Sequence, residues 1–168
     1  ADSGSYEDFA RVYRPGVDTD YRGAGARTLL FYALQNRDID ARIAIANLLL
    51  DDGVDASVVS GNLNVLHVFF GNGPHDPDRE APLLNRMIDA GADINQVSKK
   101  WGPPLITLVE HEWRSADPFQ EALFSRPDLD LSAPYGRTTV RGFILDGPWN
   151  LPALVERIHA YDAEHPDR

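Results

Sequence analysis

Apolar residues recur along the chain in stripes with the three- and four-residue spacing of one-sided helices. The three longest stripes are Ile39, Ile43, Ala46, Leu49 and Leu50; Leu83, Leu84, Met87 and Ile88; and Phe119, Ala122, Leu123 and Phe124. Because the intervening positions are mostly polar, each predicted helix covers a shared core with one face only. Shorter stripes predict a helix at each end of the chain, formed by Tyr6, Phe9, Val12 and Tyr13, and by Leu151, Leu154, Val155 and Ile158.

A short phrase accompanies these stripes and ends each time in an aspartate. The four aspartates are separated by 37, 38 and 37 residues, and they are Asp18, Asp55, Asp93 and Asp130. In the first three phrases a glycine stands two residues before the aspartate, where helices often end in a left-handed residue that glycine adopts at low cost. The fourth phrase has Ser125-Arg126-Pro127 instead, so we expect this helix end to be built differently.

A second shared pattern begins some ten residues after each phrase and predicts a shorter apolar helix. Its four copies start 36, 39 and 35 residues apart, at Thr28, Asn64, Pro103 and Thr138. Three of these residues are predicted N-caps, and Pro104 suits a first helical turn. The longer helices are predicted to start at prolines, with Asp117 capping the helix at Pro118; the other two are Pro82 and Pro152. Two signals with one period indicate tandem helix pairs.

These motifs resemble the ankyrin repeat, whose unit opens with Thr-Pro-Leu-His-x-Ala and closes with Leu-Leu-x-x-Gly-Ala-Asp-x-Asn. The segment Met87–Asn95 is close to the full closing motif, Leu49–Asp55 matches it in part, and Val65-Leu66-His67 keeps part of the opening. The resemblance covers roughly residues 6–160 and is strongest in the first two full units. Since the periods exceed the usual 33 residues, extra residues are expected in loops, above all at 71–81.

The resemblance implies an all-α fold, an ankyrin-like α-solenoid of helix-turn-helix repeats with finger loops. The expected organisation is one domain, 1–168, in which each unit buries its apolar face against its neighbours. Its parts are an N-terminal half repeat at 6–18, full repeats at 19–56, 57–95 and 96–132, a C-terminal capping repeat at 133–162, and a tail at 163–168.

Composition narrows the class of partner. The formal charge of −10 repels phosphate backbones and anionic lipid. We therefore expect a protein partner, basic in character, no nucleic acid and no membrane, and a chain that is monomeric alone. The lack of cysteine excludes disulfides and fits a cytoplasmic protein. Residue 1 is alanine, which leaves open whether a cleaved signal peptide preceded it. Arginine with abundant alanine, aspartate and glycine favours a bacterial source.

Residues with possible chemistry have structural interpretations. The resemblance implies that His67 makes a hydrogen bond between units. His75 stands near Asp76, Asp78 and Glu80, but this spacing matches no established metal site, and residues 71–80 are typical of a solvated loop. His111, with Glu112 and Trp113, lacks the spacing of a triad or a metal site. We expect no catalytic residues, no metal site and no cofactor.

In the ankyrin family the finger turns and first helices line a concave face at which partners usually bind. Carried over position by position, the resemblance implies these partner-binding residues: Tyr21, Arg22, Asn62, Lys99, Trp101, Tyr135 and Arg137. Aromatic and arginine side chains suit a desolvated interface. Weaker candidates lie on the first helices, and the alternative for each is a place in the core; they are Tyr32, Gln35, Phe70 and Trp113.

The leading hypothesis is a non-enzymatic protein–protein interaction module. Its sharpest form is an acidic inhibitor or immunity-type protein that is steered electrostatically to a basic target. One alternative is a hydrolase or other enzyme with an unrecognised site of histidines and carboxylates near His75 or His111. Another is an adaptor that holds two partners on separate surfaces. The fold alone does not rank these, since one scaffold hosts many roles.

Overall fold

The computed structural model describes residues 1–111 and 116–166, and these are mainly helical. The α-helices are α1 (Tyr6–Val12), α2 (Leu29–Ala33), α3 (Ile39–Asp51), α4 (Val65–Phe70), α5 (Pro77–Asp89), α6 (Pro104–Glu110), α7 (Asp117–Phe124), α8 (Val140–Leu145) and α9 (Pro152–Glu164). Two short 3-10 helices, η1 (Asp18–Asp20) and η2 (Ala24–Ala26), precede α2. The all-helical expectation needs one correction, because β1 (Pro134–Tyr135) and β2 (Thr138–Thr139) form an antiparallel hairpin.

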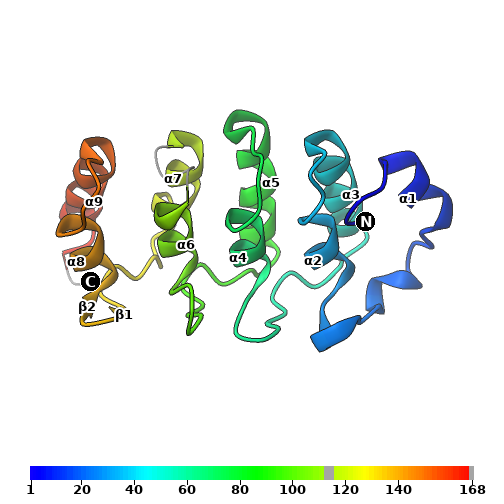
Figure 1. Ribbon diagram of the computed structural model, residues 1–168, viewed down its shortest axis with the longest axis horizontal. Helices are drawn as coiled ribbons and strands as arrows, with labels where there is room; N and C mark the ends of the chain where they lie inside the picture. Colours follow the sequence, from blue (N-terminus) through cyan, green and yellow to red (C-terminus); the bar gives the residue numbers. More distant parts are fainter. Residues whose placement is uncertain (112–115, 167–168) are drawn as a thin grey trace.

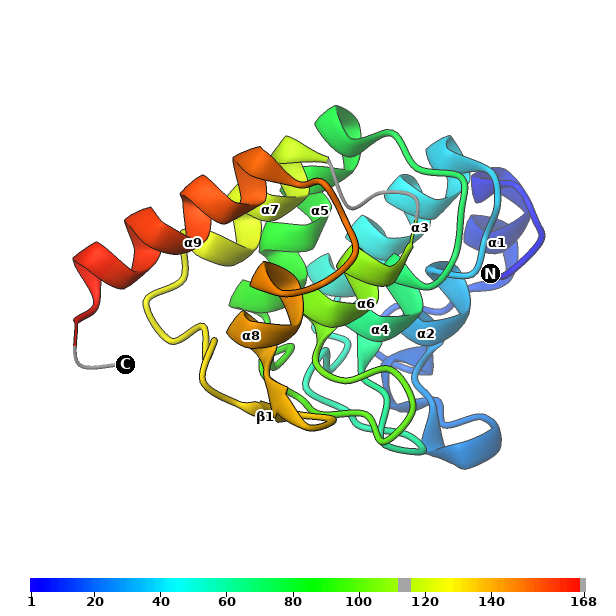
Figure 2. The same ribbon diagram turned by 60° about the vertical axis from the view of Figure 1, so that its left-hand side comes forward.

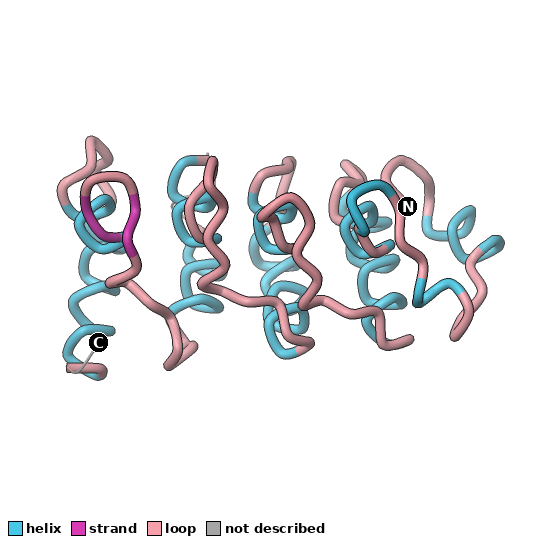
Figure 3. The backbone as a smooth tube through the Cα atoms, turned by 90° about the horizontal axis from the view of Figure 1, so that it is seen from below, coloured by secondary structure: helices cyan, strands magenta, loops and turns pink. Residues whose placement is uncertain are grey.

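The helices lie in two rows along the longest axis of the molecule (Figure 1). The outer helices pack in succession, α1 on α3, α3 on α5, α5 on α7 and α7 on α9. The inner helices are α2, α4, α6 and α8, which Figure 2 shows as a second row. The loops that precede them, at 19–28, 57–64, 96–103 and 132–139, project together on one side of the molecule (Figure 3) and are called the finger turns below.

The core fills the space between the two rows. Its largest apolar side chains are fully buried, and they include Phe31, Phe69, Phe70 and Phe119. Phe69 lies at the centre of an aromatic cluster, with ring centroids 5.3 Å from those of both Phe70 and Phe119. None of the helices in the described residues combines the length and apolar character needed to span a bilayer.

The phrases at the ends of the outer helices form as the sequence predicts. Gly53 and Gly91 have φ values of 82° and 101°, and the residue after each donates its N–H back into the last helical turn. Each of the later aspartates accepts a hydrogen bond from the backbone N–H two residues on, at 2.8 to 2.9 Å. These turns satisfy backbone groups that the helix end leaves unpaired. The aspartates Asp55, Asp93 and Asp130 are therefore turn formers.

The end of α7 is built differently, as the missing glycine predicts. The hydroxyl of Tyr161, on the next outer helix, lies 2.9 Å from the Arg126 carbonyl oxygen and 3.0 Å from that of Leu129. The hydroxyl has one proton and donates to one of these carbonyls at a time. A side chain of α9 thus holds the segment that follows α7, while the N–H groups of Ser125 and Arg126 bond carbonyls in the last turn of that helix.

The predicted helix starts are correct in part. Asn64 caps α4 in a capping box with His67, and Pro104 begins α6. Thr28 stands at the N-cap of α2, but its buried hydroxyl has no hydrogen-bond partner within the described residues. Thr138, the predicted N-cap, lies in strand β2 of the hairpin, and its neighbour Thr139 caps α8 instead.

The outer helices differ from the prediction in where they begin and end. Asp76 accepts a hydrogen bond from the Arg79 N–H, so α5 starts at Pro77 and Pro82 lies inside the helix. The predicted loop at 71–81 is correspondingly shorter. Asp117 is the first residue of α7, not its cap, while Pro152 begins α9 as predicted. The predicted tail at 163–168 overlaps α9, which runs to Glu164.

The His67 ring of α4 contacts the finger turn that follows its own helix. Its Nε2 lies 2.9 Å from the Gly102 carbonyl oxygen, to which it donates a proton. Its Nδ1 lies 3.2 Å from the Asn64 backbone N and 2.8 Å from the Asn64 side-chain oxygen, within the capping box of α4. Burial lowers the pKa of His67, against the opposing effects of the Gly102 carbonyl and Asp93. His67 thus links α4 to the next finger turn by a hydrogen bond.

Replacing His67 with phenylalanine is expected to cost about 1–3 kcal/mol of unfolding free energy, because the buried Asn64 N–H loses its acceptor and the Gly102 carbonyl keeps only the Ser98 N–H. Urea unfolding at pH 7 measures this cost. The matched control is His159→Phe on the exposed side of α9, expected to change stability by less than about 0.5 kcal/mol. Equal effects of the two substitutions would contradict the assigned role of His67.

Candidate partner-binding face

The seven residues predicted to bind a partner all lie on finger turns. Tyr21 and Arg22 belong to the first turn, Asn62 to the second, Lys99 and Trp101 to the third, and Tyr135 and Arg137 to the fourth. Five of them are exposed, while Trp101 and Tyr135 are half-buried. The finger turns and the inner helices together form one surface, which we call the inner face. The four finger turns thus bring residues that are far apart in the sequence onto this one surface (Figure 3).

The second finger turn gives Asn62 a conformational role. Ser60 and Leu63 exchange two backbone hydrogen bonds, of 2.8 and 3.0 Å, around the two-residue turn Gly61-Asn62. Both turn residues have positive φ, 59° and 65°. Glycine and asparagine are the residues that tolerate this geometry best. The turn therefore accounts for Asn62 without a partner.

The third finger turn holds Trp101 in place. Ser98 and Gly102 exchange backbone hydrogen bonds of 2.9 Å, and the Ser98 hydroxyl accepts the N–H groups of Lys100 and Trp101. The Lys100 ammonium lies 4.4 Å from the Trp101 ring centroid, and the His111 ring lies 5.9 Å away on α6's C-terminal side. The indole is therefore a fixed, half-buried ring with a cation on it.

The fourth finger turn packs against the third. The Tyr135 ring covers Gly102 so closely that a Cβ there would come within 2.6 Å of Cε2 of that ring. The same ring meets Phe143 edge-on at 4.7 Å, and its hydroxyl donates to Glu110 at 3.2 Å. Burial and the Glu110 carboxylate raise the pKa of Tyr135. Tyr135 thus joins two finger turns, and Arg137 is exposed at the turn of the hairpin in the fourth.

The first finger turn is fixed by Tyr32 of α2, whose hydroxyl fills the space where a side chain at Gly23 would lie. Of the other first-helix candidates, Gln35 is half-buried, whereas Phe70 is fully buried and belongs to the core. For Phe70 the structure supports the alternative, a core residue, because every residue of α4 is buried. Trp113 and Glu112 lie outside the described residues.

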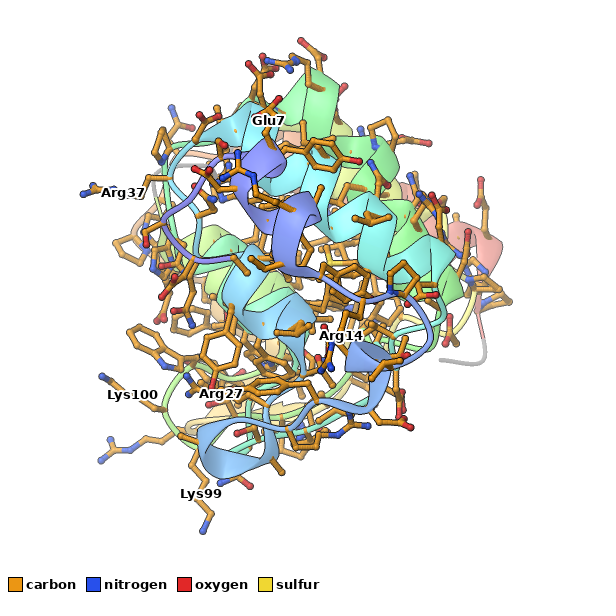
Figure 4. All side chains as sticks on the ribbon, turned by 90° about the vertical axis from the view of Figure 1, so that its right-hand side faces the viewer. Glu7, Arg14, Arg27, Arg37, Lys99 and Lys100 are labelled. Carbon is orange, nitrogen blue, oxygen red and sulfur yellow. The ribbon has the colours of Figure 1, made fainter. Side chains whose placement is uncertain are left out.

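A groove of about 210 Å³ runs across the inner face. Its walls come from α4, α6, the residues that follow α2, α4 and α6, and three finger turns, and they include Arg27, Gln35, Val68, Asn72, Trp101 and His111. Figure 4 views the molecule along its long axis and shows Arg27 and Lys100 on the same side. The groove combines an aromatic wall with polar and cationic rims, a composition that anchors a partner's side chain.

A buried ionic cluster joins α3 to α5. The Glu80 carboxylate accepts hydrogen bonds from the Arg42 guanidinium at 2.7 Å and from His75 Nδ1 at 2.9 Å, and all three side chains are buried. His75 Nε2 lies 2.9 Å from the Phe69 carbonyl oxygen, so the ring satisfies both acceptors only with a proton on each nitrogen. The interpretation of residues 71–80 as a solvated loop was wrong here.

Burial on its own raises the pKa of Glu80, but the hydrogen bond from His75, the charges of His75 and Arg42 and the Asp76 N–H outweigh it and lower that pKa. Arg42 is further held by the carbonyl oxygens of Asn36 and Pro74, each at 2.6 Å. Every member of the cluster is thus satisfied within the fold. The cluster stabilises the contact between α3 and α5, and the sequence signal for it is the 38-residue separation of Arg42 and Glu80.

Residues 1–111 and 116–166 contain no group of three or more histidine, aspartate and glutamate side chains arranged to hold a metal ion. The second histidine region is also occupied by contacts within the fold. His111 Nδ1 lies 2.6 Å from the Thr107 carbonyl oxygen, and its ring faces Trp101. His75 and His111 lie on different structural features, one in the core and one on the inner face.

Comparisons with known proteins give one structural likeness. A crystal structure of a functionally unknown protein from Leptotrichia buccalis superposes with a TM-score of 0.74 over 99% of this chain and 92% of that one. The two sequences are 19% identical, so this likeness concerns the fold alone. No family model matches the sequence, and a search of curated proteins finds no match.

Proposed function

We propose that this chain is a divergent ankyrin-like solenoid that acts as a non-enzymatic protein-binding module through its inner face. The repeat motifs of the sequence are the basis for the family assignment. Each motif occupies an equivalent place in the structure, with closing phrases after outer helices and opening patterns at inner helices. The proposed domain is the whole chain, with the shorter half unit at 6–18 and the capping unit at 133–162.

Hydrogen bonds and ion pairs join successive helix pairs along the molecule, which supports the proposal that the pairs stack as units. The Asn64 amide donates to the Asp93 carbonyl oxygen at 2.6 Å, and the Asn95 amide donates to that of Asp128 at 2.7 Å. Arginine–carboxylate pairs join neighbouring outer helices at separations of 35 to 40 residues, including Arg86 with Asp51. Such surface pairs contribute at most about 1 kcal/mol each. They stabilise the stack without forming a ligand site.

The observation that carries the functional proposal is the exposure of anchoring residues on the finger turns. Tyr21 is 49% exposed, and Arg22, Lys99 and Arg137 are exposed beside the half-buried Trp101. Aromatic rings held rigidly next to cations lose little entropy on binding and supply much of the energy of protein interfaces. An inhibitor is the sharpest form of this function, since a module with only a binding surface acts by occluding its target.

Affinity capture from an extract of the source organism tests the proposal. Wild-type protein is compared with Trp101→Ala, which removes the ring that lines the groove. Loss of a hot-spot residue costs about 2 kcal/mol or more, so the captured partner's Kd is expected to rise about 30-fold.

Tyr6→Ala is the control, because Tyr6 is an aromatic residue of α1 with 37% exposure and lies outside the inner face. Titration of each purified variant with the identified partner gives the Kd, and thermal unfolding verifies that both variants fold. A partner that binds Trp101→Ala and wild type equally, or one that loses affinity only with Tyr6→Ala, would place the interface elsewhere.

A further inference from the structure

The inner face differs in charge from the rest of the molecule. Four segments, 21–37, 56–75, 94–109 and 131–145, supply most of the finger turns and nearly all of the inner helices. These segments contain no aspartate or glutamate, although the chain has 26 of them. They do contain seven lysines and arginines, namely Arg22, Arg27, Arg37, Lys99, Lys100, Arg137 and Arg141. The acidic character of the protein therefore belongs to the outer helices and the connections.

Ion pairing divides the cations in the same way. On the outer helices and at the N-terminus, each arginine in the described residues has a carboxylate partner, as Arg86 has Asp51. Within residues 1–111 and 116–166, the cations with no ion pair are Arg22, Arg27, Arg37, Lys99, Lys100 and Arg137. All six come from the acid-free segments. Figure 4 shows Arg27, Arg37, Lys99 and Lys100 on one side of the molecule.

Two carboxylates at the border of this surface, Glu110 and Asp55, are already engaged, whereas Asp20 is exposed at the start of the first finger turn. Glu110, at the end of α6, accepts a hydrogen bond from the Tyr135 hydroxyl. Asp55 lies close enough to Arg22 for the arginine to lower its pKa, but the Ser57 hydroxyl and N–H contribute more to this lowering. Its Oδ1 is bound to both Ser57 groups, at 2.6 and 2.9 Å. The free cations of the inner face therefore remain available to a ligand.

We infer that the inner face binds an acidic polypeptide segment, which places carboxylates against Lys99, Lys100 and Arg27 and an apolar side chain beside Trp101. This inference rests on the proposed binding function and specifies its partner. At about 210 Å³ the groove is smaller than the roughly 300 Å³ at which small-molecule pockets begin, and it suits a side chain. The net charge of −10 disfavours a nucleic acid, whose dense phosphates meet the acidic surroundings as well as the face.

The basic partner predicted from net charge remains untested. Net charge governs the field at long range, which salt screens beyond about 8 Å at physiological ionic strength. Contacts at the inner face are made at shorter distances, where the local cations decide which partner fits. The local positive charge of the inner face therefore decides its partner more than the net charge of the whole protein does.

A displayed library of random 16-residue peptides tests the inference with the full chain as bait. Selection is run in parallel on wild type, on Lys100→Glu and on the control Arg11→Glu, which changes the net charge equally on α1. Wild type and the control are expected to enrich acidic peptides that contain an aromatic or leucine residue. Synthetic copies of these peptides are expected to lose about tenfold or more in affinity for Lys100→Glu.

The outcomes separate this inference from the proposed function. Enrichment of basic peptides would overturn the inference of an acidic partner. Equal affinity of the selected peptides for wild type, Lys99→Glu and Lys100→Glu would also overturn it. In either case the capture experiment with Trp101→Ala would still decide the proposed binding function. Tighter binding of a 16-nucleotide single-stranded DNA than of the best peptide would overturn it in favour of a nucleic acid. Failure to enrich any peptide above the background of uncoated support would also overturn it.

Discussion

Replacing Glu80 with alanine is expected to lower the free energy of unfolding by about 3–5 kcal/mol, because the substitution leaves the Arg42 guanidinium buried without its carboxylate and removes the acceptor that His75 Nδ1 contacts. The cluster is fully buried, so water does not compensate for the loss. A typical domain has only about 5–15 kcal/mol of stability in total. Urea unfolding at pH 7, followed by far-ultraviolet circular dichroism, measures the difference.

Asp78→Ala is the matched control, since Asp78 is an exposed carboxylate in the same first turn of α5. Its removal is expected to change stability by less than about 1 kcal/mol. If Glu80→Ala costs no more than Asp78→Ala, then the buried cluster contributes no net stability to the folded chain.

The same carboxylate gives the wild type a dependence on pH. The pKa of Glu80 is lowered in the folded state, so its contribution is complete above its unfolded pKa of 4.5 and is lost as the pH falls through the folded value. Wild-type stability is therefore expected to decrease below about pH 4.5. Glu80→Gln is expected to reduce this dependence, which chemical unfolding at pH 3.5, 4.5 and 7 measures.

Replacing Phe69 with alanine is expected to cost about 3–5 kcal/mol through the cavity that it creates. Phe69 is fully buried on α4 and contacts Phe70, Phe119 of α7 and the His75 ring. The hole therefore opens where an inner helix, an outer helix and the buried cluster meet, and none of these can close it alone. Thermal unfolding by calorimetry and urea titration measure the loss.

Tyr21→Ala removes an aromatic side chain of similar size from a position that is 49% exposed, and it is expected to change stability by less than about 1 kcal/mol. A small effect of Phe69→Ala, comparable with that of Tyr21→Ala, would mean that the core relaxes around the missing ring. The aromatic cluster would then be a poorly packed part of the fold.

Local rules were sufficient to predict the ends of most outer helices. A glycine such as Gly53 or Gly91 ends a helix by its own backbone freedom, and an aspartate such as Asp55 closes a turn with the next residues in the chain. These contacts join residues that are close together in the chain, and they can therefore be predicted from the sequence. The same locality explains why the finger turns, including the positive-φ pair Gly61-Asn62, lie where the second pattern places them.

Contacts made across the fold were the ones that sequence patterns missed. His75 and Glu80 have the composition of a solvated loop, and only Arg42, which is 38 residues away on the neighbouring helix, makes their burial favourable. Likewise, Pro82 was predicted to begin a helix that the capping by Asp76 starts five residues earlier. The candidate site was located by turn position, but the contacts of Tyr135 with Gly102 and Glu110 were not predictable, since these residues lie 25 or more positions away in the chain.

The separation of acid-free segments from the outer helices gives the molecule a fixed electric dipole across its two rows. Although its net charge is negative, the protein presents opposite signs on opposite sides. On a positively charged support it would adsorb by the outer helices and leave the finger turns facing the solution. The charge of the support therefore determines whether the inner face is accessible in a binding assay. An amine-coated sensor, which is positively charged, is expected to leave the inner face exposed to the solution.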